Sequence, residues 1–377
     1  MNGPISRFIV VDLTRQLAGP TVTRILADLG SRVIKVVQSG SKGDVMGAQK
    51  EMAAQLWAKK EIVELDLRSN EGIELLHRLL SKADVLVENF KPGVMKKMGL
   101  SWNTVHKRHP KLIYGSVSGF GNSGGPDGER PAMDVVIQAM SGIMETTGFD
   151  DKPPSGAGAP IADVNTGMFG AIGILAALLG RYETKTGAYV DVSMLDTLAS
   201  VMSSIGVRQL NGLMEKMYPD GKYPRATGSR SNIPFSIYKC KDGRYISIIA
   251  YQPHFYKAMW QALGRPEMIT DERFQGRNRV KNKKLFVQIL EEVLSTKNMQ
   301  EWVEILRNVG VPAAPVNDMK GAVNEEQLKH RNMIVETTDG VKLIGNPVKI
   351  SGYPDNPTKL TSIDNLKTDI NTLLAKL

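Results

Sequence analysis

Short runs of β-branched and aliphatic residues recur through the first third of the chain and alternate with helical patterns. Strands are expected at Phe8–Leu13, Arg32–Val37, Ile62–Leu67, Val85–Phe90 and Leu112–Val117. Between them, Thr21–Leu29 and Asn70–Ser81 carry apolar residues at helical spacing. This alternation predicts an α/β fold with a largely parallel sheet and helices on both of its faces.

The middle of the chain begins with Gly119–Pro131, a loop rich in Gly, Pro, Asn and Asp that must be irregular. Two helical stretches are expected after it, at Ala132–Thr146 and Val164–Tyr182, followed by a strand at Tyr189–Ser193 and one more helix. The large α/β domain is therefore expected to cover residues 1–217.

A different pattern begins at residue 231. The apolar runs Phe235–Cys240 and Arg244–Ala250 flank Lys241-Asp242-Gly243, which is a hairpin signal. Three helical runs follow, at Gln252–Leu263, Lys281–Ser295 and Met299–Val309. We therefore expect a small α+β domain at residues 231–309.

Two segments rich in Gly or Pro bracket this small domain. Tyr218–Arg230 and Gly310–Asp318 are expected to be linkers. The chain then resumes strand-like runs at Ile334–Glu336 and Lys342–Ile344 and ends in an amphipathic helical pattern near Asp364–Leu377. Residues 319–377 are expected to return to the large domain.

The composition of the 377 residues is that of a soluble globular protein, with 42% hydrophobic and 23% charged residues. The net charge of +9 suits nucleic acid, a membrane surface or a phosphate-bearing small molecule. Lys and Arg are spread along the chain except at Arg277–Lys284, which we interpret as a solvated helix face. A phosphate-bearing cofactor is therefore favoured over nucleic acid.

Cysteine content and hydropathy bear on the location of the protein. Cys240 is the only cysteine, so no intrachain disulfide is possible, and this fits a reducing cytoplasm. The N-terminus leads into a strand-like run without a signal-peptide pattern. The uncharged run Met168–Gly180 is too short to span a bilayer, so we expect a buried core helix and no membrane partner.

Asp163 is the strongest candidate for chemistry. It stands directly before the apolar run Met168–Gly180, so it would lie in the first turn of a buried helix. There the helix dipole and free backbone N–H groups stabilise a charged carboxylate. An ionised carboxylate beside an apolar wall is a plausible nucleophile, and an ordinary helix N-cap is the alternative.

Several common chemistries lack their motifs. No Gly-Lys-Ser/Thr stands at P-loop spacing, and the G-x-G-x-x-G match at Gly119–Gly124 leads into an irregular loop rather than opening a helix. The five histidines have no Cys, Asp or Glu partner in a recognisable metal-ligand motif, so no metal is expected. The G-x-S-x-G match at Gly121–Gly125 lies inside the irregular loop Gly119–Pro131 rather than at a strand-to-helix elbow, so a nucleophilic serine is not supported.

Six segments keep one order along nearly the whole chain: Val11–Pro20, Leu29–Val36, Leu65–Arg68, Ala83–Leu100, Ile161–Gly167 and Asp191–Asp196. Together they resemble class III CoA transferases, the family of formyl-CoA transferase. The most specific motif, Ala-Asp-Val-Leu-Val-Glu-Asn-Phe-Lys-Pro-Gly, begins at Ala83. The resemblance implies a large Rossmann-like open parallel-sheet domain, a small α+β domain and an acyl-CoA:carboxylate CoA-transferase.

The resemblance also implies a mechanism, because Asp163 matches the family's catalytic aspartate. A carboxylate can attack a thioester to form a mixed anhydride, and the released CoA thiolate then converts the aspartate into an aspartyl-CoA thioester. A second acid receives CoA through the reverse steps, so no ATP or metal is needed. The acyl donor and the acceptor acid stay open.

Six positions match residues that bind coenzyme A in the family: Leu65, Arg68, Asn89, Phe90, Lys97 and Met98. Arg68 matches a cation near the CoA phosphates, a role for which the guanidinium fork is suited. Asn89, Phe90, Lys97 and Met98 match positions that cradle the adenosine. Phe90 could instead be a core residue at the end of a strand.

Three departures from the family pattern bear on the function. The racemase branch carries a histidine where this chain has Met133, just before Asp134, and moving an α-proton usually needs a pair of acid/base groups. Formyl-CoA transferases carry a glutamine near Leu17, whereas here it is Gln16. The resemblance makes Gln16, Leu17, Met133 and Asp134 possible active-site neighbours. Relatives also carry an Asn-Arg pair and a Lys where this chain has Leu56–Lys60, with Lys59 or Lys60 as electrostatic substitutes.

These departures keep two alternatives open. An acyl-CoA racemase or isomerase on the same fold is disfavoured by Met133. A non-catalytic CoA-binding protein is disfavoured by Asp163. In this family two chains interlock as linked rings, and the two linkers around the small domain fit that plan, so we expect an interlocked homodimer with an acyl-CoA and a carboxylic acid as substrates.

Overall fold

The chain forms two compact units. The computed structural model describes residues 3–40, 50–128, 130–149, 151–219, 221, 225, 233–276, 278–353, 360–362 and 365–377. The first unit contains residues 1–143, 156–213 and 326–377, and the second contains residues 144–155 and 214–325. The expected small domain lies within the second unit, and most of the expected linker Tyr218–Arg230 lies outside the described residues.

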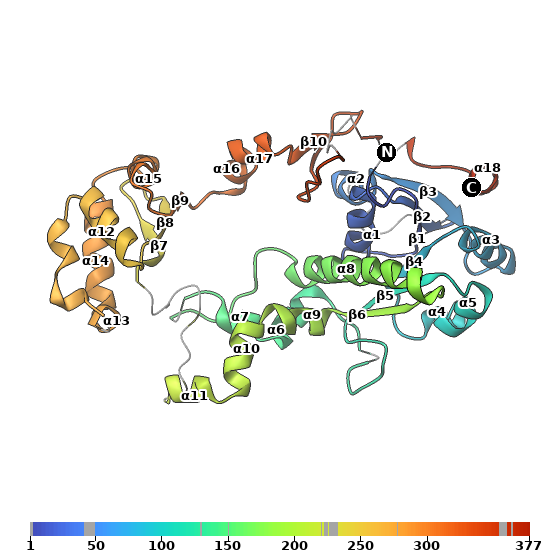
Figure 1. Ribbon diagram of the computed structural model, residues 1–377, viewed down its shortest axis with the longest axis horizontal. Helices are drawn as coiled ribbons and strands as arrows, with labels where there is room; N and C mark the ends of the chain where they lie inside the picture. Colours follow the sequence, from blue (N-terminus) through green and yellow to red (C-terminus); the bar gives the residue numbers. More distant parts are fainter. Residues whose placement is uncertain are drawn as a thin grey trace. The chain divides into compact units, whose positions relative to one another are not determined.

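The first unit is built on a six-stranded sheet in which every neighbouring pair is parallel (Figure 1). Across the sheet the strands are β3 (Lys60–Leu65), β2 (Arg32–Gln38), β1 (Ile9–Asp12), β4 (Val85–Glu88), β5 (Ile113–Ser118) and β6 (Tyr189–Ser193). This is the strand order of a doubly wound fold, and the order reverses direction between β1 and β4. The predicted Rossmann-like parallel sheet is confirmed.

Helices cover both faces of this sheet, because alternate strand residues point to opposite sides. On one face, Val11 lies in a core with α3 (Asn70–Leu80), α5 (Trp102–Arg108) and α18 (Ile370–Lys376). On the other face, its neighbour Val10 lies in a core with α1 (Ala18–Asp28) and α8 (Ile161–Thr184). The strands and helices α1, α3 and α8 are close to the predicted ranges, whereas α5 was not predicted.

Helices α1 and α8 pack closely through glycines of α8. A Cβ atom at Gly167 would stand 2.5 Å from a Thr21 methyl carbon, and one at Gly170 would stand 2.7 Å from a Val22 methyl carbon. Only a residue without a side chain permits this approach. The contact therefore fixes the first turns of α1 and α8 side by side.

Helix α8 is half exposed rather than fully buried as expected. Its 24 residues make it the one helix in the described parts of the chain that is long and apolar enough to cross a membrane. Ala171, Ile174 and Leu178 lie in the core, whereas Ile172 and Leu179 are 60% and 69% exposed. Helix α8 is therefore a layer of the fold with an uncovered apolar face.

The remaining elements of the first unit are short helices and a separate two-stranded sheet of β10 and β11. They are α2 (Lys50–Trp57), α4 (Val94–Lys97), α6 (Asp134–Met140), α7 (Ile143–Thr146), α9 (Met194–Val201), α10 (Ser203–Leu210), α11 (Leu213–Met217), α17 (Glu326–His330), β10 (Ile334–Glu336) and β11 (Lys342–Ile344), with α7 and α11 at the boundary of the units. The C-terminal segment packs on the first unit, because Ile62 of edge strand β3 exchanges backbone hydrogen bonds with Leu366 and Thr368.

Two expected elements of the first unit differ. The single helix expected at Ala132–Thr146 is two helices, because Gly142 has a φ of +81° and a right-handed helix cannot continue through it. The C-terminal helix is shorter than expected, since it begins at Ile370 after an Asp369 cap.

The second unit is a small antiparallel sheet with helices. Its strands are β7 (Phe235–Lys239), β8 (Tyr245–Ile249) and β9 (Ala313–Pro315), and its helices are α12 (Pro253–Ala262), α13 (Asn278–Lys281), α14 (Lys283–Leu294), α15 (Met299–Asn308), α16 (Met319–Val323) and the 3₁₀ turns Pro266–Ile269 and Glu272–Phe274. The expected hairpin is present. The segment Gly310–Asp318 is not simply a linker, because part of it pairs with β8 as strand β9.

Candidate active site

Asp163 lies in the first turn of α8, three residues after Pro160, where the helix begins. Its side chain is half-buried, and it is not an N-cap, because the capping position belongs to Pro160. The position in the first turn agrees with the sequence analysis. The interpretation as an ordinary N-cap does not.

A second carboxylate, from another helix, caps the start of α8. Asp134, the first residue of α6, accepts hydrogen bonds from the backbone N–H groups of Ala162 at 2.8 Å and Asp163 at 3.1 Å. Its other oxygen accepts from the Gln138 amide nitrogen at 2.5 Å. The Gln138 carbonyl oxygen in turn accepts from Ala157 N at 2.9 Å. The two acidic side chains therefore lie together, and each has a different role.

The electrostatics of Asp163 differ from the expectation. We expected free N–H groups of the helix to stabilise its charged form, but Asp134 takes two of them. Burial, and then the negative charge of Asp134, raises the pKa of Asp163 to about 6. Asp163 is therefore a more basic carboxylate than an ordinary aspartate and is ionised above about pH 6.

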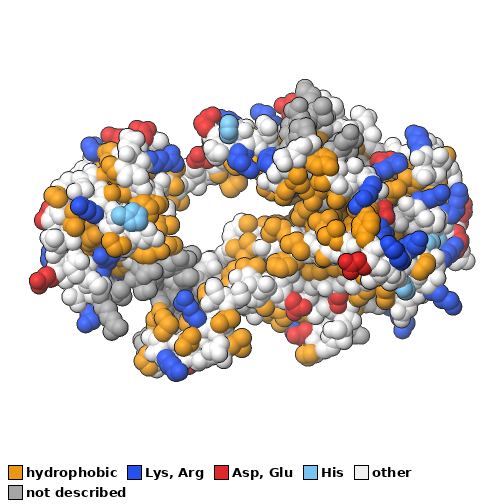
Figure 2. Space-filling view, in the orientation of Figure 1, with side chains coloured by type: hydrophobic (Ala, Val, Ile, Leu, Met, Phe, Trp, Pro, Cys, Tyr) orange, Lys and Arg blue, Asp and Glu red, His pale blue; other side chains and the backbone are white. Residues whose placement is uncertain are grey.

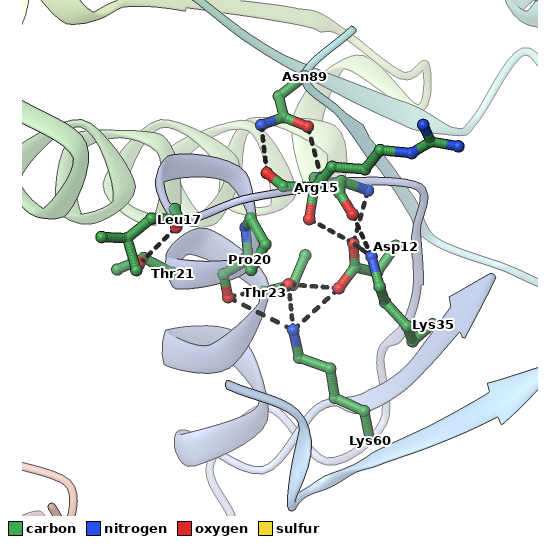
Figure 3. Close-up of polar contacts among 10 residues, drawn as sticks. Asp12, Arg15, Leu17, Pro20, Thr21, Thr23, Lys35, Lys60 and Asn89 are labelled. Atoms are coloured by element: carbon green, nitrogen blue, oxygen red, sulfur yellow. Dashed lines mark hydrogen bonds and ion pairs between the residues drawn. The ribbon is translucent and has the colours of Figure 1, made fainter. Parts of the chain in front are cut away.

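The loop between β1 and α1 forms a second part of the site (Figure 3). Gln16 has a φ of +62°, a conformation that non-glycine residues rarely adopt. The Asn89 side chain holds Arg15, the residue before Gln16, through two hydrogen bonds. Its Oδ1 accepts from Arg15 N at 2.8 Å, and its amide nitrogen donates to Arg15 O at 2.8 Å. Strained backbone held by its surroundings is common at functional sites. Leu17 follows at the start of α1.

Three fully buried charged side chains connect this loop to the sheet (Figure 3). Asp12, at the end of β1, is 3.5 Å from the Lys35 ammonium and 2.9 Å from the Lys60 ammonium. Lys35 also donates to the carbonyl of Thr14 in the loop, and Lys60 donates to Thr23 of α1 at 2.7 Å. The cluster therefore ties the loop and α1 to strands β2 and β3.

The pKa values of this cluster reflect its burial. Burial would raise the pKa of Asp12, but Lys35 and Lys60 hold it well below its usual range. Burial lowers the pKa of Lys60 to about 8, against the attraction of Asp12. Burial therefore disfavours the charged form of Lys60, which Asp12 and Thr23 hold in the interior. Lys59 instead forms a 2.7 Å ion pair with Asp28.

The topology brings the loop and the end of β4 together. The order of strands reverses between β1 and β4, and ligands of open parallel sheets bind at such a switch point, beyond the carboxyl ends of the strands. Arg15, which follows β1, lies 5.3 Å from the centre of the Phe90 ring, which follows β4. Helix α1, which follows this loop, packs through Thr21 on Gly167 of α8, the helix that carries Asp163 in its first turn.

The predicted CoA-binding residues differ in accessibility. Arg68 and Lys97 are exposed, and Phe90 and Met98 are half-buried. Leu65 is a core residue, 2% exposed, so its side chain is closed to a ligand. The Asn89 amide is engaged with the loop backbone. No described contact links Arg68 to Lys97.

A further cavity lies elsewhere. It measures about 790 Å³ and is lined by α1, α2 and the C-terminal segment, including Arg24, Lys59, Ile344 and Tyr353. Asp163, Asp134 and the six predicted CoA-binding residues do not line it, whereas Lys59 and Lys60 do. We therefore place the chemistry at the Asp163 and Asp134 carboxylates, where geometry and charge agree, rather than in this cavity.

A family model described as CoA-transferase family III matches residues 5–360. The chain belongs to this family. It is a CoA-transferase, an enzyme that moves coenzyme A from an acyl-CoA thioester to a carboxylic acid.

Relatives of this CoA-transferase are similar over nearly its whole length. An acetyl-CoA:oxalate CoA-transferase of Acetobacter aceti is 37% identical over 94% of this chain and 91% of its own. A succinyl-CoA:glutarate CoA-transferase of Homo sapiens is 30% identical over 93% of this chain and 81% of its own. The crystal structure of a CAIB/BAIF family protein from Brucella suis superposes with a TM-score of 0.83, at 32% identity and 96% coverage of both chains.

The sequence analysis missed two residues of this CoA-transferase's candidate site. Gln138 is 1% exposed and holds Asp134, but a lone glutamine in a helical pattern gives no signal of this. Arg15 could have been found as the cation of the first motif. Lys60 was named as an electrostatic substitute near the nucleotide, and the structure corrects this because its ammonium is fully buried beside Asp12.

Proposed function

We propose that Asp163 is the nucleophile of this CoA-transferase. Three observations support the assignment: it lies in the first turn of α8, its carboxyl has a raised pKa beside Asp134, and it matches the catalytic aspartate of the family. A pKa of about 6 leaves the carboxylate ionised at neutral pH and makes it more basic than an ordinary aspartate. The juxtaposition of Asp163 and Asp134 is the observation that carries the proposal.

The reaction balances without ATP. An Asp163 oxygen attacks the thioester carbonyl, the carbon–sulfur bond breaks, and CoA leaves as a thiolate, which gives a mixed anhydride. The thiolate attacks the Asp163 carbonyl carbon, and the first acid leaves as a carboxylate. The acceptor carboxylate then attacks this aspartyl-CoA thioester and releases the thiolate. Attack of the thiolate on the acceptor's carbonyl forms the new acyl-CoA and restores Asp163.

The binding roles divide between two ends of the substrate. The exposed cations Arg68 and Lys97 are suited to the phosphates of CoA, since charged donors form the stronger hydrogen bonds to phosphate oxygens. Phe90 offers a ring face for the adenine. The loop of Gln16 and Leu17 lies beside the turn of Asp163, where it would contact the acyl group.

The acceptor that we propose is a small dicarboxylic acid. Relatives over most of this chain are named for oxalate, glutarate or mesaconate, all of which are dicarboxylic acids. Screening acetyl-CoA and succinyl-CoA against mono- and dicarboxylic acids tests this. Transfer confined to monocarboxylic acids would refute it.

Asp163→Ala and Asp163→Asn test the nucleophile directly. Wild-type enzyme mixed with an acyl-CoA should gain a CoA adduct at Asp163, detected by mass spectrometry, and both variants should lose the adduct and the transfer activity. Folding is checked by the unchanged circular dichroism spectrum. Near-wild-type turnover in Asp163→Ala excludes the mechanism, and α-proton exchange in deuterated water without transfer favours the racemase.

We also propose a cytoplasmic homodimer. A buried, lone Cys240 is compatible with a reducing compartment. Hydrophobic side chains gather over α8 in the space-filling view (Figure 2), among them the exposed Met168, Phe169, Ile172 and Leu179. Exposed apolar surface of this kind marks an interface between proteins, and a second copy of the chain is the partner that we propose.

A further inference from the structure

We infer that Asp134 is a positioning residue for the nucleophile, held in place by Gln138, and that its negative charge increases the reactivity of Asp163. The inference rests on the proposed role of Asp163 as nucleophile. Asp134 acts through Asp163 and its helix, and needs no contact with the substrate.

The hydrogen bonds of Asp134 fix the start of α8. One oxygen accepts from the N–H groups of Ala162 and Asp163, which are the second and third residues of the helix. These are the donors that an N-cap side chain normally satisfies, and here Pro160 at the capping position cannot do so. A residue 29 positions earlier therefore supplies the cap from another helix.

Gln138 fixes Asp134 in turn. It stands one helical turn after Asp134 on α6 and is 1% exposed. Its amide donates to the second Asp134 oxygen at 2.5 Å and its carbonyl accepts from Ala157 N, in the segment that leads into α8. Both oxygens of Asp134 are thus engaged, and its carboxylate cannot turn away from Asp163.

This arrangement weakens the stabilisation that the N-terminus of α8 gives to the charged form of Asp163. A first-turn carboxylate would normally gain from nearby N–H groups and the helix dipole. Here Asp134 accepts from two of those donors, including the N–H of Asp163 itself, and adds a negative charge. Asp163 is left with less stabilisation of its charged form, so it is a stronger nucleophile.

The other charged groups on elements packed against α8 act elsewhere. Arg24 and Asp28 of α1 pair with each other, and Asp191 of β6 accepts from Asn122. Asp196 of α9 is exposed, and β5 carries no charged side chain. Among the described residues, Asp134 is the one whose charge acts on Asp163.

The decisive variant is Asp134→Asn, since its amide oxygen can keep the cap while the charge is lost. The rate of CoA-adduct formation on Asp163 is measured in single turnovers between about pH 5 and pH 8. In the wild type the rate should rise with a midpoint near pH 6. In Asp134→Asn the midpoint should move to lower pH and the plateau rate should fall several-fold, with the KM for acyl-CoA unchanged.

A purely structural role predicts a different result. If Asp134 only caps α8, Asp134→Asn keeps both the wild-type midpoint and the plateau, and the inference is overturned. Asp196→Asn is the matched control, because it removes a first-turn aspartate from another helix of the same unit and should leave the midpoint unchanged. A midpoint that moves equally in both variants also overturns the inference.

Gln138→Met provides a second test and serves if Asp134→Asn does not fold. Methionine has a similar length but forms neither hydrogen bond, so Asp134 gains freedom to turn. We expect a lower kcat at an unchanged KM, and a midpoint between those of the wild type and Asp134→Asn. A wild-type kcat and midpoint contradict the positioning role of Gln138 and, with it, the inference.

Detection of the CoA adduct on Asp163 also distinguishes a failure of this inference from a failure of the proposed function. Formation of the adduct on Asp163 in the wild type with no shift in Asp134→Asn leaves the nucleophile in place and removes only the role of Asp134. Absence of the adduct, with activity retained in Asp163→Ala, removes the nucleophile itself.

Discussion

Asp12, Lys35 and Lys60 show how single residues support the site without contacting substrate. They form a fully buried cluster of one negative and two positive charges. Burying charge is costly unless it is paired and hydrogen-bonded. Here the carbonyl of Thr14 and the hydroxyl of Thr23 satisfy the ammonium groups, and the loop before α1 is fixed as a result.

Asp12→Asn should therefore destabilise the protein more than Lys60→Met. Loss of Asp12 leaves two buried ammonium groups without a counter-charge, at a cost of about 3–5 kcal/mol. Loss of Lys60 leaves Asp12 paired with Lys35 and should cost clearly less. Urea denaturation at pH 7 measures both, and equal losses would contradict the pairing scheme.

The surface cations Arg68 and Lys97 are the residues that we propose to bind the phosphates of CoA. Arg68→Ala and Lys97→Ala should each raise the KM for acyl-CoA about ten-fold, which is the loss of one charged contact to phosphate. Because these contacts lie far from the thioester, kcat should hardly change. Steady-state kinetics with acyl-CoA varied measure this, with the exposed Lys82→Ala as the control. Wild-type KM values in both variants would mean that the nucleotide lies elsewhere.

Sequence reasoning reached Asp163 and named Asp134 as a possible neighbour, but it did not predict the contacts between them. The residue stands before an apolar run, and that pattern predicts a first-turn position. Asp134 and Gln138 meet it only through hydrogen bonds between α6, the preceding segment and α8. Periodicity carries no information on such contacts, so the expectation of an ordinary, stabilised carboxylate failed.

At the scale of elements, the alternation of strands and helices was sufficient to predict the parallel sheet. Hydrophobic strands buried on both faces are distinctive in sequence. Helix α2 was not predicted, because Ala53, Leu56 and Trp57 pack on Leu366 from the far end of the chain. Strand β9 was taken for a linker for a similar reason, since its pairing with β8 spans more than 60 residues.

The contact between α1 and α8 provides a test at this scale. Gly167→Ala should destabilise the protein by about 1–3 kcal/mol, because the new methyl would press against Thr21 and force the helices apart. Transfer activity should fall as well, since α1 and α8 carry the two parts of the site. Thermal and urea unfolding measure the stability.

Gly180→Ala is the matched control on the same helix. A Cβ atom at Gly180 has nothing within 4 Å, so alanine should be neutral or stabilise by up to about 1 kcal/mol through its higher helix propensity. Equal effects of the two substitutions would show that helix propensity, rather than the contact with α1, determines the result.

The division of the chain into units was harder to predict from the sequence than the individual strands and helices. The chain divides into two units, but Met144–Ser155 joins the second unit although it lies inside the first in sequence. The guanidinium of Arg225 explains part of this, because it donates to the carbonyls of Phe149 and Pro153. A contact across more than 70 residues leaves no local pattern, so domain boundaries drawn from composition did not include it.

The uncovered face of α8 leads to a prediction about assembly. Ile172 is 60% exposed and Leu179 is 69% exposed, on a helix whose other face is core. If a second copy covers this face, the wild type should sediment as a dimer that persists at low micromolar concentration. Ile172→Glu would place a charge in the buried interface, so it should yield monomer or fail to assemble.

The control variant introduces a glutamate at a position where we expect no contact with a second copy of the chain. Asn371 is exposed on α18, on the opposite face of the sheet, so Asn371→Glu should stay dimeric and fold normally. Sedimentation velocity distinguishes the outcomes, and circular dichroism verifies that Ile172→Glu retains secondary structure. A folded wild-type monomer would contradict the homodimer altogether. A dimer unaffected by Ile172→Glu would move the interface away from α8, because a buried glutamate without a partner is too costly for a tight interface to tolerate.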